Sequence, residues 1–241
     1  MKRVKRGTGD WGLGTRDWED FSTNLSKSRQ NIPTNKGSRP CPFWAMFLAS
    51  PLSLLLFPCY FFLFTSTAHA LPGQSVETVV GWINAHPTLR PGVGDGLRVT
   101  KGDTPAQRFS FQATVLAPGR VTFPADRGTI RTERMSFYDM VNGVTPDRLK
   151  ESLRVIYGPD VYQDYDRAKV VYEYPTPETV DLARRQNRPL EAAQQGELRL
   201  GERFAYWMEV TKTDRGKAFN GQMTVFLKED LDKLETEIRD R

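Results

Sequence analysis

The chain has 241 residues, 34 Lys and Arg against 29 Asp and Glu, and two cysteines. Residues 1–70 hold nine Lys and Arg and four Asp and Glu, so the whole net charge of +5 lies there and residues 71–241 are neutral. We therefore expect no nucleic-acid binding, because that function needs positive charge clustered on the folded domain. Cys41 and Cys59 both precede residue 71, which excludes thiolate chemistry, disulfides and Cys-ligated zinc from the rest.

An apolar run over residues 43–64 follows a positively charged flank and is itself followed by small residues. This order is typical of a secretory signal and predicts cleavage between Ala70 and Leu71. Two alternatives remain. The run is about as long as the ~20 residues that a membrane anchor needs, and a buried helix would also be apolar, although two prolines disfavour it. We expect a leader over residues 1–70 and one globular domain over residues 71–241.

The leader is longer than the usual signal of about 15–30 residues. One explanation is a start assigned too far upstream, with Met46 as the alternative start. The other is a two-part targeting peptide for a plastid lumen. Residues 21–39 fit that explanation because they contain no acidic residue, whereas the four acidic residues before them do not fit.

The domain is expected to begin with a helix over residues 75–86, which has an N-cap serine and one apolar face. Residues 91–96 are rich in glycine but lack the sequence of a phosphate-binding loop, so they are interpreted as a plain loop. Apolar and polar residues then alternate over residues 109–115. A Pro-Gly turn at residues 117–120 and a second strand at residues 121–123 complete the expected hairpin.

Another strand is expected over residues 129–138. A second helix is expected over residues 145–158, where Thr and Pro form the start and Gly-Pro the end. A strand over residues 168–174 follows. The same Thr-Pro start then predicts a polar helix over residues 176–188.

Two further strands are expected over residues 198–211 and 218–227, and an amphipathic helix over residues 227–238. Strand pairs with short turns, and helices at both ends and in the middle, favour the α+β class. We expect a mainly antiparallel sheet of about 5–6 strands, with an N-terminal helix, one or two central helices and a C-terminal helix.

Few side chains of the expected domain suit catalysis. His86 is its only histidine, so a Ser-His-Asp triad or a histidine metal site would have to use it. It stands next to a proline at a helix end, which indicates a surface residue. We therefore name no catalytic and no cofactor-binding residue, and we expect no cofactor.

Asp160, Asp164 and Asp166 form the densest group of carboxylates and are the metal-site candidates. The segment lacks the ligand order, central glycine and closing glutamate of a calcium loop. The favoured interpretation is a solvated loop. A cation site and a pair of catalytic carboxylates are the alternatives, and a catalytic pair is defined by separation in space.

Several arginines are candidates for anion binding. Acidic residues lie close to them in sequence, among them Glu133, Glu178 and Asp181, so a mixed charged face is the favoured interpretation. The arginines concerned are Arg131, Arg134, Arg184, Arg185 and Arg188.

Three segments resemble exported cyanobacterial proteins that are themselves uncharacterised: residues 70–83, residues 104–111 and residues 156–160. The resemblance covers most of residues 71–241. It implies a periplasmic or thylakoid-lumenal compartment and carries over no functional residue.

We therefore expect an exported, non-enzymatic binding or accessory protein whose partner is a protein or a small ligand. Contact with a membrane is expected only through residues 43–64, if they are not removed. The alternative is a carboxylate-based hydrolase that acts on a polymer or glycan through the aspartates of residues 160–166.

Overall fold

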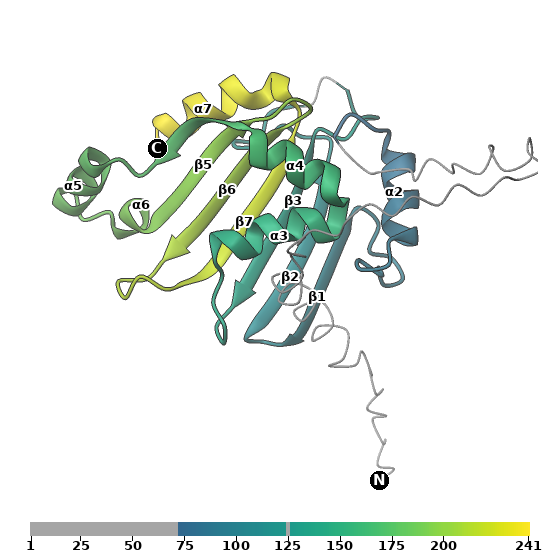
Figure 1. The fold of residues 1–241 in the computed structure, drawn as a ribbon, viewed down its shortest axis with the longest axis horizontal. Coiled ribbons are helices and arrows are strands. Elements are labelled where there is room, and N and C mark those ends of the chain that lie inside the picture. Colours follow the sequence, from purple (N-terminus) through teal and green to yellow (C-terminus); the bar gives the residue numbers. More distant parts are fainter. Residues whose placement is uncertain (1–71, 124–125) are drawn as a thin grey trace, which may run out of the picture.

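The computed structural model describes residues 72–123 and 126–241, in which an antiparallel sheet is flanked by helices (Figure 1). The strands lie in the order β1-β2-β3-β7-β6-β5-β4. Every neighbouring pair is antiparallel. The seven strands are β1 (Arg98–Thr104), β2 (Gln107–Thr114), β3 (Thr132–Asp139), β4 (Lys169–Tyr174), β5 (Gln194–Leu200), β6 (Ala205–Lys212) and β7 (Ala218–Phe226).

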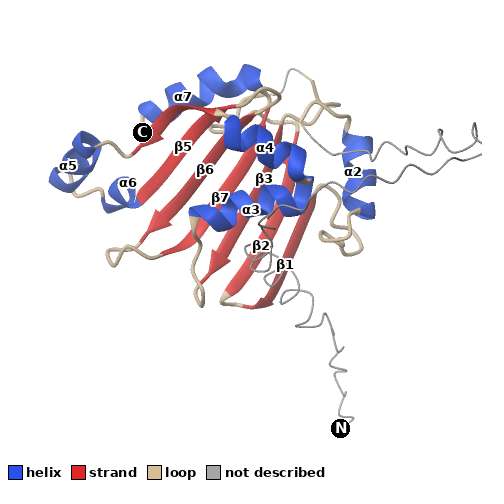
Figure 2. Cartoon of the chain, viewed as in Figure 1, coloured by secondary structure: helices blue, strands red, loops and turns tan. Residues whose placement is uncertain are grey.

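The described part of the chain also contains six α-helices and a short 3-10 helix at Lys228–Asp230. Helices α3 and α4 lie across one face of the sheet, and α2 lies beside them (Figure 2). The α-helices are α2 (Val76–Ala85), α3 (Pro146–Tyr157), α4 (Pro159–Arg167), α5 (Pro177–Arg185), α6 (Pro189–Ala193) and α7 (Leu231–Arg239).

The path of the chain places its first strand, β1, at one edge of the sheet and its last strand, β7, at the centre. Strands β1, β2 and β3 form a meander, after which α3 and α4 carry the chain to the far edge at β4. Strands β5, β6 and β7 then return strand by strand until β7 pairs with β3. The pairing of β3 with β7 therefore joins the two halves of the sheet.

The two faces of the sheet differ because successive strand residues point to opposite sides. The face under α2, α3 and α4 carries the larger apolar core, which includes Phe109, Phe111, Met135 and Met223. On the other face, α7 covers a smaller cluster around Trp207 at one end of the strands. The remainder of that second face is polar.

Three of the four expected helix starts are confirmed, while the C-terminal helix, expected from residue 227, begins at Leu231 after the 3-10 helix. In each of the three confirmed cases a hydroxyl side chain accepts a hydrogen bond from a backbone N–H three residues on, which satisfies a donor of the first turn. Ser75 does so for α2, Thr145 for α3 and Thr176 for α5, each at 3.2 Å.

The expected hairpin with its turn at residues 117–120 is wrong. Residues 121–123 are exposed and belong to no strand, and the tight turn lies at residues 105–106, between β1 and β2. The segment expected to form the turn, residues 117–120, contacts a helix instead: the Arg120 N–H donates a hydrogen bond to Glu237 of α7 at 2.7 Å.

The single strand expected over residues 198–211 is also wrong. The chain folds back at residues 201–204, where the Gly201 N–H donates to the Phe204 carbonyl at 2.9 Å. The segment therefore supplies the hairpin of β5 and β6. This extra strand and β1 bring the sheet to seven strands rather than 5–6, while the α+β class and the antiparallel pairing are confirmed.

Candidate functional site

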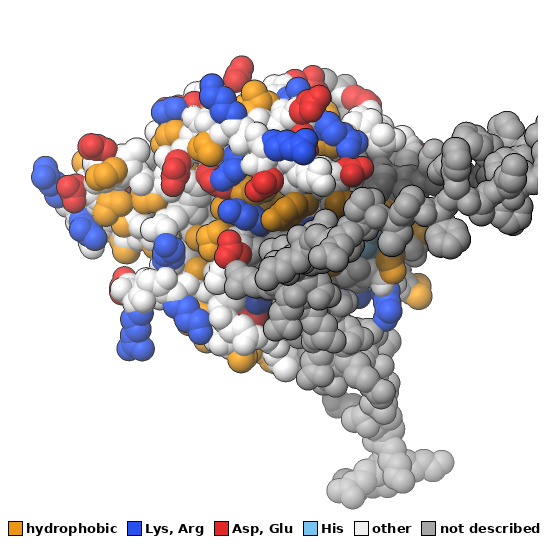
Figure 3. All heavy atoms as spheres, viewed as in Figure 1, with side chains coloured by type: hydrophobic (Ala, Val, Ile, Leu, Met, Phe, Trp, Pro, Cys, Tyr) orange, Lys and Arg blue, Asp and Glu red, His pale blue; other side chains and the backbone are white. Residues whose placement is uncertain are grey.

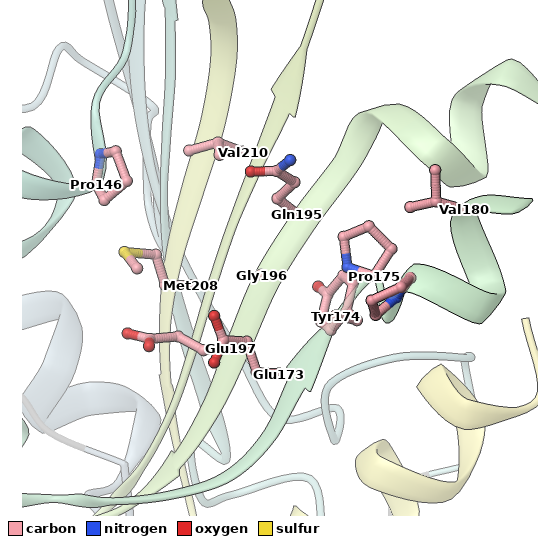
Figure 4. Close-up of a pocket in the computed structure, with 11 residues that line it drawn as sticks. Pro146, Glu173, Tyr174, Pro175, Val180, Gln195, Gly196, Glu197, Met208 and Val210 are labelled. Atoms are coloured by element: carbon pink, nitrogen blue, oxygen red, sulfur yellow. The ribbon is translucent and has the colours of Figure 1, made fainter. Parts of the chain in front are cut away.

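A groove opens on the helix side of the sheet, between the start of α3 and α5, with a cavity volume of about 430 Å³. This is the size of a pocket for a small ligand. Its floor is formed by β4, β5 and β6, and prolines and a valine form its rim (Figure 4). We call it the glutamate groove. Its lining residues are Pro146, Glu173, Tyr174, Pro175, Pro177, Val180, Gln195, Gly196, Glu197, Met208 and Val210.

Two carboxylates lie side by side in the groove. Glu173 of β4 and Glu197 of β5 are direct cross-strand partners, so their Cβ atoms are about 5 Å apart. Figure 4 shows the two glutamates next to each other, with Met208 beyond Glu197. No Lys, Arg or His is among the lining residues, although Arg199, next to the lining, forms an ion pair with Glu197.

Glu197 is fixed in place by two neighbours. The Arg199 guanidinium donates to both carboxylate oxygens, at 2.8 and 3.0 Å, and the Tyr165 hydroxyl of α4 donates to Oε1. Burial alone would raise the pKa of Glu197, but these hydrogen bonds outweigh burial and hold the pKa below its usual value. Glu197 is therefore an ionised, positioned carboxylate.

Glu173 is exposed and has no ion pair among the described residues. It is free to rotate towards a ligand, while Gln195 adds an amide on the same floor. The lining contains no serine, threonine, cysteine or histidine, the usual nucleophiles and bases. Two carboxylates beside apolar walls suit the binding of a cationic group that is attached to an apolar body.

The expectation of a solvated loop at Asp160, Asp164 and Asp166 is wrong, because these residues lie on α4. Gly158 begins the helix, and Val161 and Tyr165 bury its apolar face one turn apart. Within the described residues no group of three His, Cys, Asp or Glu is placed to hold a metal ion.

The Asp164 carboxylate is held by structural hydrogen bonds. It accepts hydrogen bonds from the backbone N–H groups of residues 202–204, at 2.9 to 3.4 Å, and from the Tyr206 hydroxyl at 2.6 Å. It thereby anchors the turn between β5 and β6 to α4. Asp160 and Asp166 are exposed and do not share these contacts.

His86 is half-buried rather than a surface residue. Its Nε2 lies 2.9 Å from the Ile156 carbonyl, and its Nδ1 accepts from the N–H groups of Thr88 and Leu89. Burial lowers the pKa of His86, with Lys101 acting in the same direction and the Ile156 contact against it. A neutral ring that ends α2 and contacts α3 satisfies all of these bonds.

The mixed charged face expected for the arginines is found at Arg131 and at Arg188, which pairs with Glu191 at 3.2 Å. Lys, Arg, Asp and Glu are interspersed on the side of α3 and α4 (Figure 3). Arg131 pairs with Asp230 at 2.8 Å and with Glu229 at 2.8 Å. Arg184 and Arg185 are exposed on α5.

Arg134 is the exception. The acidic residue next to it in sequence, Glu133, is buried under the helices on the opposite face of the sheet. Because successive residues of a strand point to opposite faces, Glu133 cannot neutralise the charge of Arg134. No described residue accepts a hydrogen bond from Arg134, and its Nε is buried without a partner.

Sequence reasoning missed both groove glutamates. A signal was present, because Gln195, Glu197 and Arg199 alternate with Leu198 and Leu200 in the pattern of a strand. Their position opposite Glu173 depends on the pairing of β4 with β5, which the strand boundaries drawn from the sequence did not allow.

Comparisons with known proteins find no match: no family model matches the chain, and neither a curated protein nor a solved structure shows significant similarity to it. The apolar run over residues 43–64, the cleavage site at Ala70 and Leu71, and both cysteines lie outside the described residues. In the two described ranges, no helix has the length and apolar character to cross a membrane.

Proposed function

We propose that this chain is an exported, non-enzymatic binding or accessory protein and that the glutamate groove binds its ligand. The observation that carries the proposal is an open groove with apolar walls and two adjacent carboxylates, of which Glu173 has no ion pair among the described residues, and with no Lys, Arg, His, Ser, Thr or Cys in its lining. The ligand class that fits is a cation with an apolar body, such as an organic amine or a lysine or arginine side chain of a partner protein. The periplasm or the thylakoid lumen is the proposed compartment.

The alternative, a carboxylate-based hydrolase, has less support. The aspartates of α4 do not converge. Glu173 and Glu197 are cross-strand partners, and a retaining glycosidase also uses two neighbouring carboxyl groups. That reaction also needs a carboxyl whose pKa is raised so that it can donate a proton. The pKa of Glu197 is lowered instead.

The proposal is tested with benzylammonium, which combines a cation with an aromatic ring, and with benzoate of the same size. Titration of the full chain, followed by NMR, is expected to shift groove resonances with benzylammonium and not with benzoate. Glu173→Gln is expected to weaken binding about three- to tenfold, since one ionic contact is lost.

Asp181→Asn is the matched control, because Asp181 is an exposed acid on α5 outside the groove lining. It removes the same charge and is expected to leave the affinity unchanged. Equal binding of benzoate, or equal losses in both variants, would contradict a cation site in the glutamate groove.

A further inference from the structure

The polar part of the second sheet face is a separate surface, opposite the glutamate groove. Three arginines from neighbouring strands point to it: Arg98 of β1, Arg108 of β2 and Arg134 of β3. We call this surface the arginine face and define it by Arg98, Arg108 and Arg134 together with Ser110, Gln112 and Ser136. The register places Arg98, Gln112 and Arg134 in one row and Ser110 beside Ser136 in the next.

On the arginine face the described residues carry more positive than negative charge. None of its three arginines has an ion pair among the described residues. Burial lowers the pKa of Arg134, and the one carboxylate on this side of the central strands, Glu209, acts against it. Glu209 also accepts hydrogen bonds from Tyr174 at 2.6 Å and Arg241 at 3.0 Å. Arg98 and Arg134 lie two strands apart, or about 10 Å, so a ligand with carboxylates in series can contact both.

A second observation marks the same place. Arg134 is directly opposite Thr224 of β7. The Arg134 Nε and the Thr224 Oγ1 are both buried without a hydrogen-bond partner in the described part of the chain. Unpaired buried polar atoms are costly, and the position of Arg134 above Thr224 is therefore not explained by hydrogen bonds within the described residues.

The chemistry around the arginines selects the class of ligand. Hydroxyl and amide side chains lie beside them, and the Arg134 guanidinium also lies 6.0 Å from the ring centroid of the buried Trp207. Among the strand residues of this surface, Tyr138 is the one large hydrophobic residue with substantial exposure, at 36%. Protein interfaces are centred on buried apolar or aromatic anchors, which this face lacks. Single-stranded nucleic acids need a series of aromatic rings for stacking, which it also lacks. A hydroxyl-rich polyanion satisfies both the charges and the hydrogen-bonding groups.

We propose that the arginine face binds an acidic polysaccharide whose uronate carboxylates pair with Arg98, Arg108 and Arg134. The probe is oligogalacturonate, titrated into the full chain by calorimetry at low and at physiological salt. Neutral maltohexaose, polyglutamate and a single-stranded oligonucleotide of equal charge are the comparison ligands. Oligogalacturonate is expected to bind most tightly, and more weakly as salt screens the charges.

The double variant Arg98→Gln/Arg108→Gln changes two exposed side chains and is expected to fold normally, as checked by circular dichroism. It should lose about tenfold in affinity for oligogalacturonate. The control Arg184→Gln/Arg185→Gln removes two exposed arginines from α5 and should bind like the unchanged chain.

Three results would each overturn the proposal: no binding of oligogalacturonate, binding of polyglutamate or the oligonucleotide as tightly as oligogalacturonate, or equal losses of affinity in both variants. Benzylammonium binding in the glutamate groove is unaffected by any of them, so the two proposals fail separately.

Discussion

The carboxyl of Glu133 is enclosed on the helix side of β3, at 0% exposure. Its Oε2 accepts a hydrogen bond from the Tyr157 hydroxyl of α3 at 2.6 Å, and its Oε1 has no partner in the described structure. Burial raises the pKa of Glu133 from 4.5 to about 7, against the opposing effect of the Tyr157 hydrogen bond. The folded protein therefore keeps a proton that the unfolded chain releases near pH 4.5.

We predict that Glu133→Gln changes how stability depends on pH. Between pH 4.5 and 7 the unfolded chain loses the proton first, so Glu133 lowers the stability of the native protein as pH rises, by about 3 kcal/mol in all. The neutral variant lacks this loss, so its stability relative to the native chain should increase through that interval and level off above pH 7. Urea unfolding at pH 4.5, 6 and 8 measures the difference.

Glu202→Gln is the control for this prediction, since Glu202 is exposed in the turn between β5 and β6. Its curve should run parallel to that of the native protein. Parallel curves for Glu133→Gln as well would show that the buried carboxyl does not titrate in this range.

Among the secondary-structure elements, α4 depends on Asp164 for its connection to the sheet. Asp164→Ala removes the acceptor of the β5–β6 turn and leaves the hydroxyl of the buried Tyr206 without its short bond. We predict a loss of about 2–3 kcal/mol, and a melting temperature lower by roughly 4–12 °C. Asp166→Ala, an exposed change on the same helix, should stay within about 0.5 kcal/mol. Thermal unfolding of both variants distinguishes them, and equal melting temperatures would refute an anchoring role.

Local signals in the sequence predicted four of the six described α-helices, missing α4 and α6, and predicted the long-range pairings poorly. A cap residue such as Ser75 or Thr145 satisfies its own helix within three residues, so its effect is visible in a short stretch of sequence. The break at Gly201 is different, because both halves of residues 198–211 have strand character and only tertiary packing separates them. The segment at Asp160 resembled a loop by its polarity, while Val161 and Tyr165 supplied a helical face only two residues wide.

The candidate sites could not be predicted for the same reason. Glu173 and Glu197 are 24 residues apart in sequence and lie side by side because β4 pairs with β5. Arg134 and Glu133 are adjacent in sequence, but successive side chains of β3 point to opposite faces of the sheet. A count of charges along the sequence does not distinguish these two pairs. The register of the strands decides that the first pair lies together and the second lies on opposite faces.

At the scale of the whole molecule, the net charge of residues 71–241 is zero, but charges of opposite sign lie on opposite faces of the sheet. Carboxylates gather in the glutamate groove on the helix side, and unpaired arginines gather on the arginine face. Each surface therefore favours a ligand of opposite sign to the other. A protein with both could hold a cationic and an acidic partner at once without either competing for the same residues.

The last prediction concerns which part of the chain performs this function. Every proposed contact lies after residue 71, while the net charge and the apolar run precede it. We predict that N-terminal sequencing and intact mass will find a chain that begins at Leu71 in a soluble extracytoplasmic fraction. Ala70→Arg, which removes the small residue before the cleavage site, should leave the full mass in the membrane fraction. A native chain of full mass in the membrane would instead make residues 43–64 an anchor, and both faces of the sheet would then act at a membrane surface.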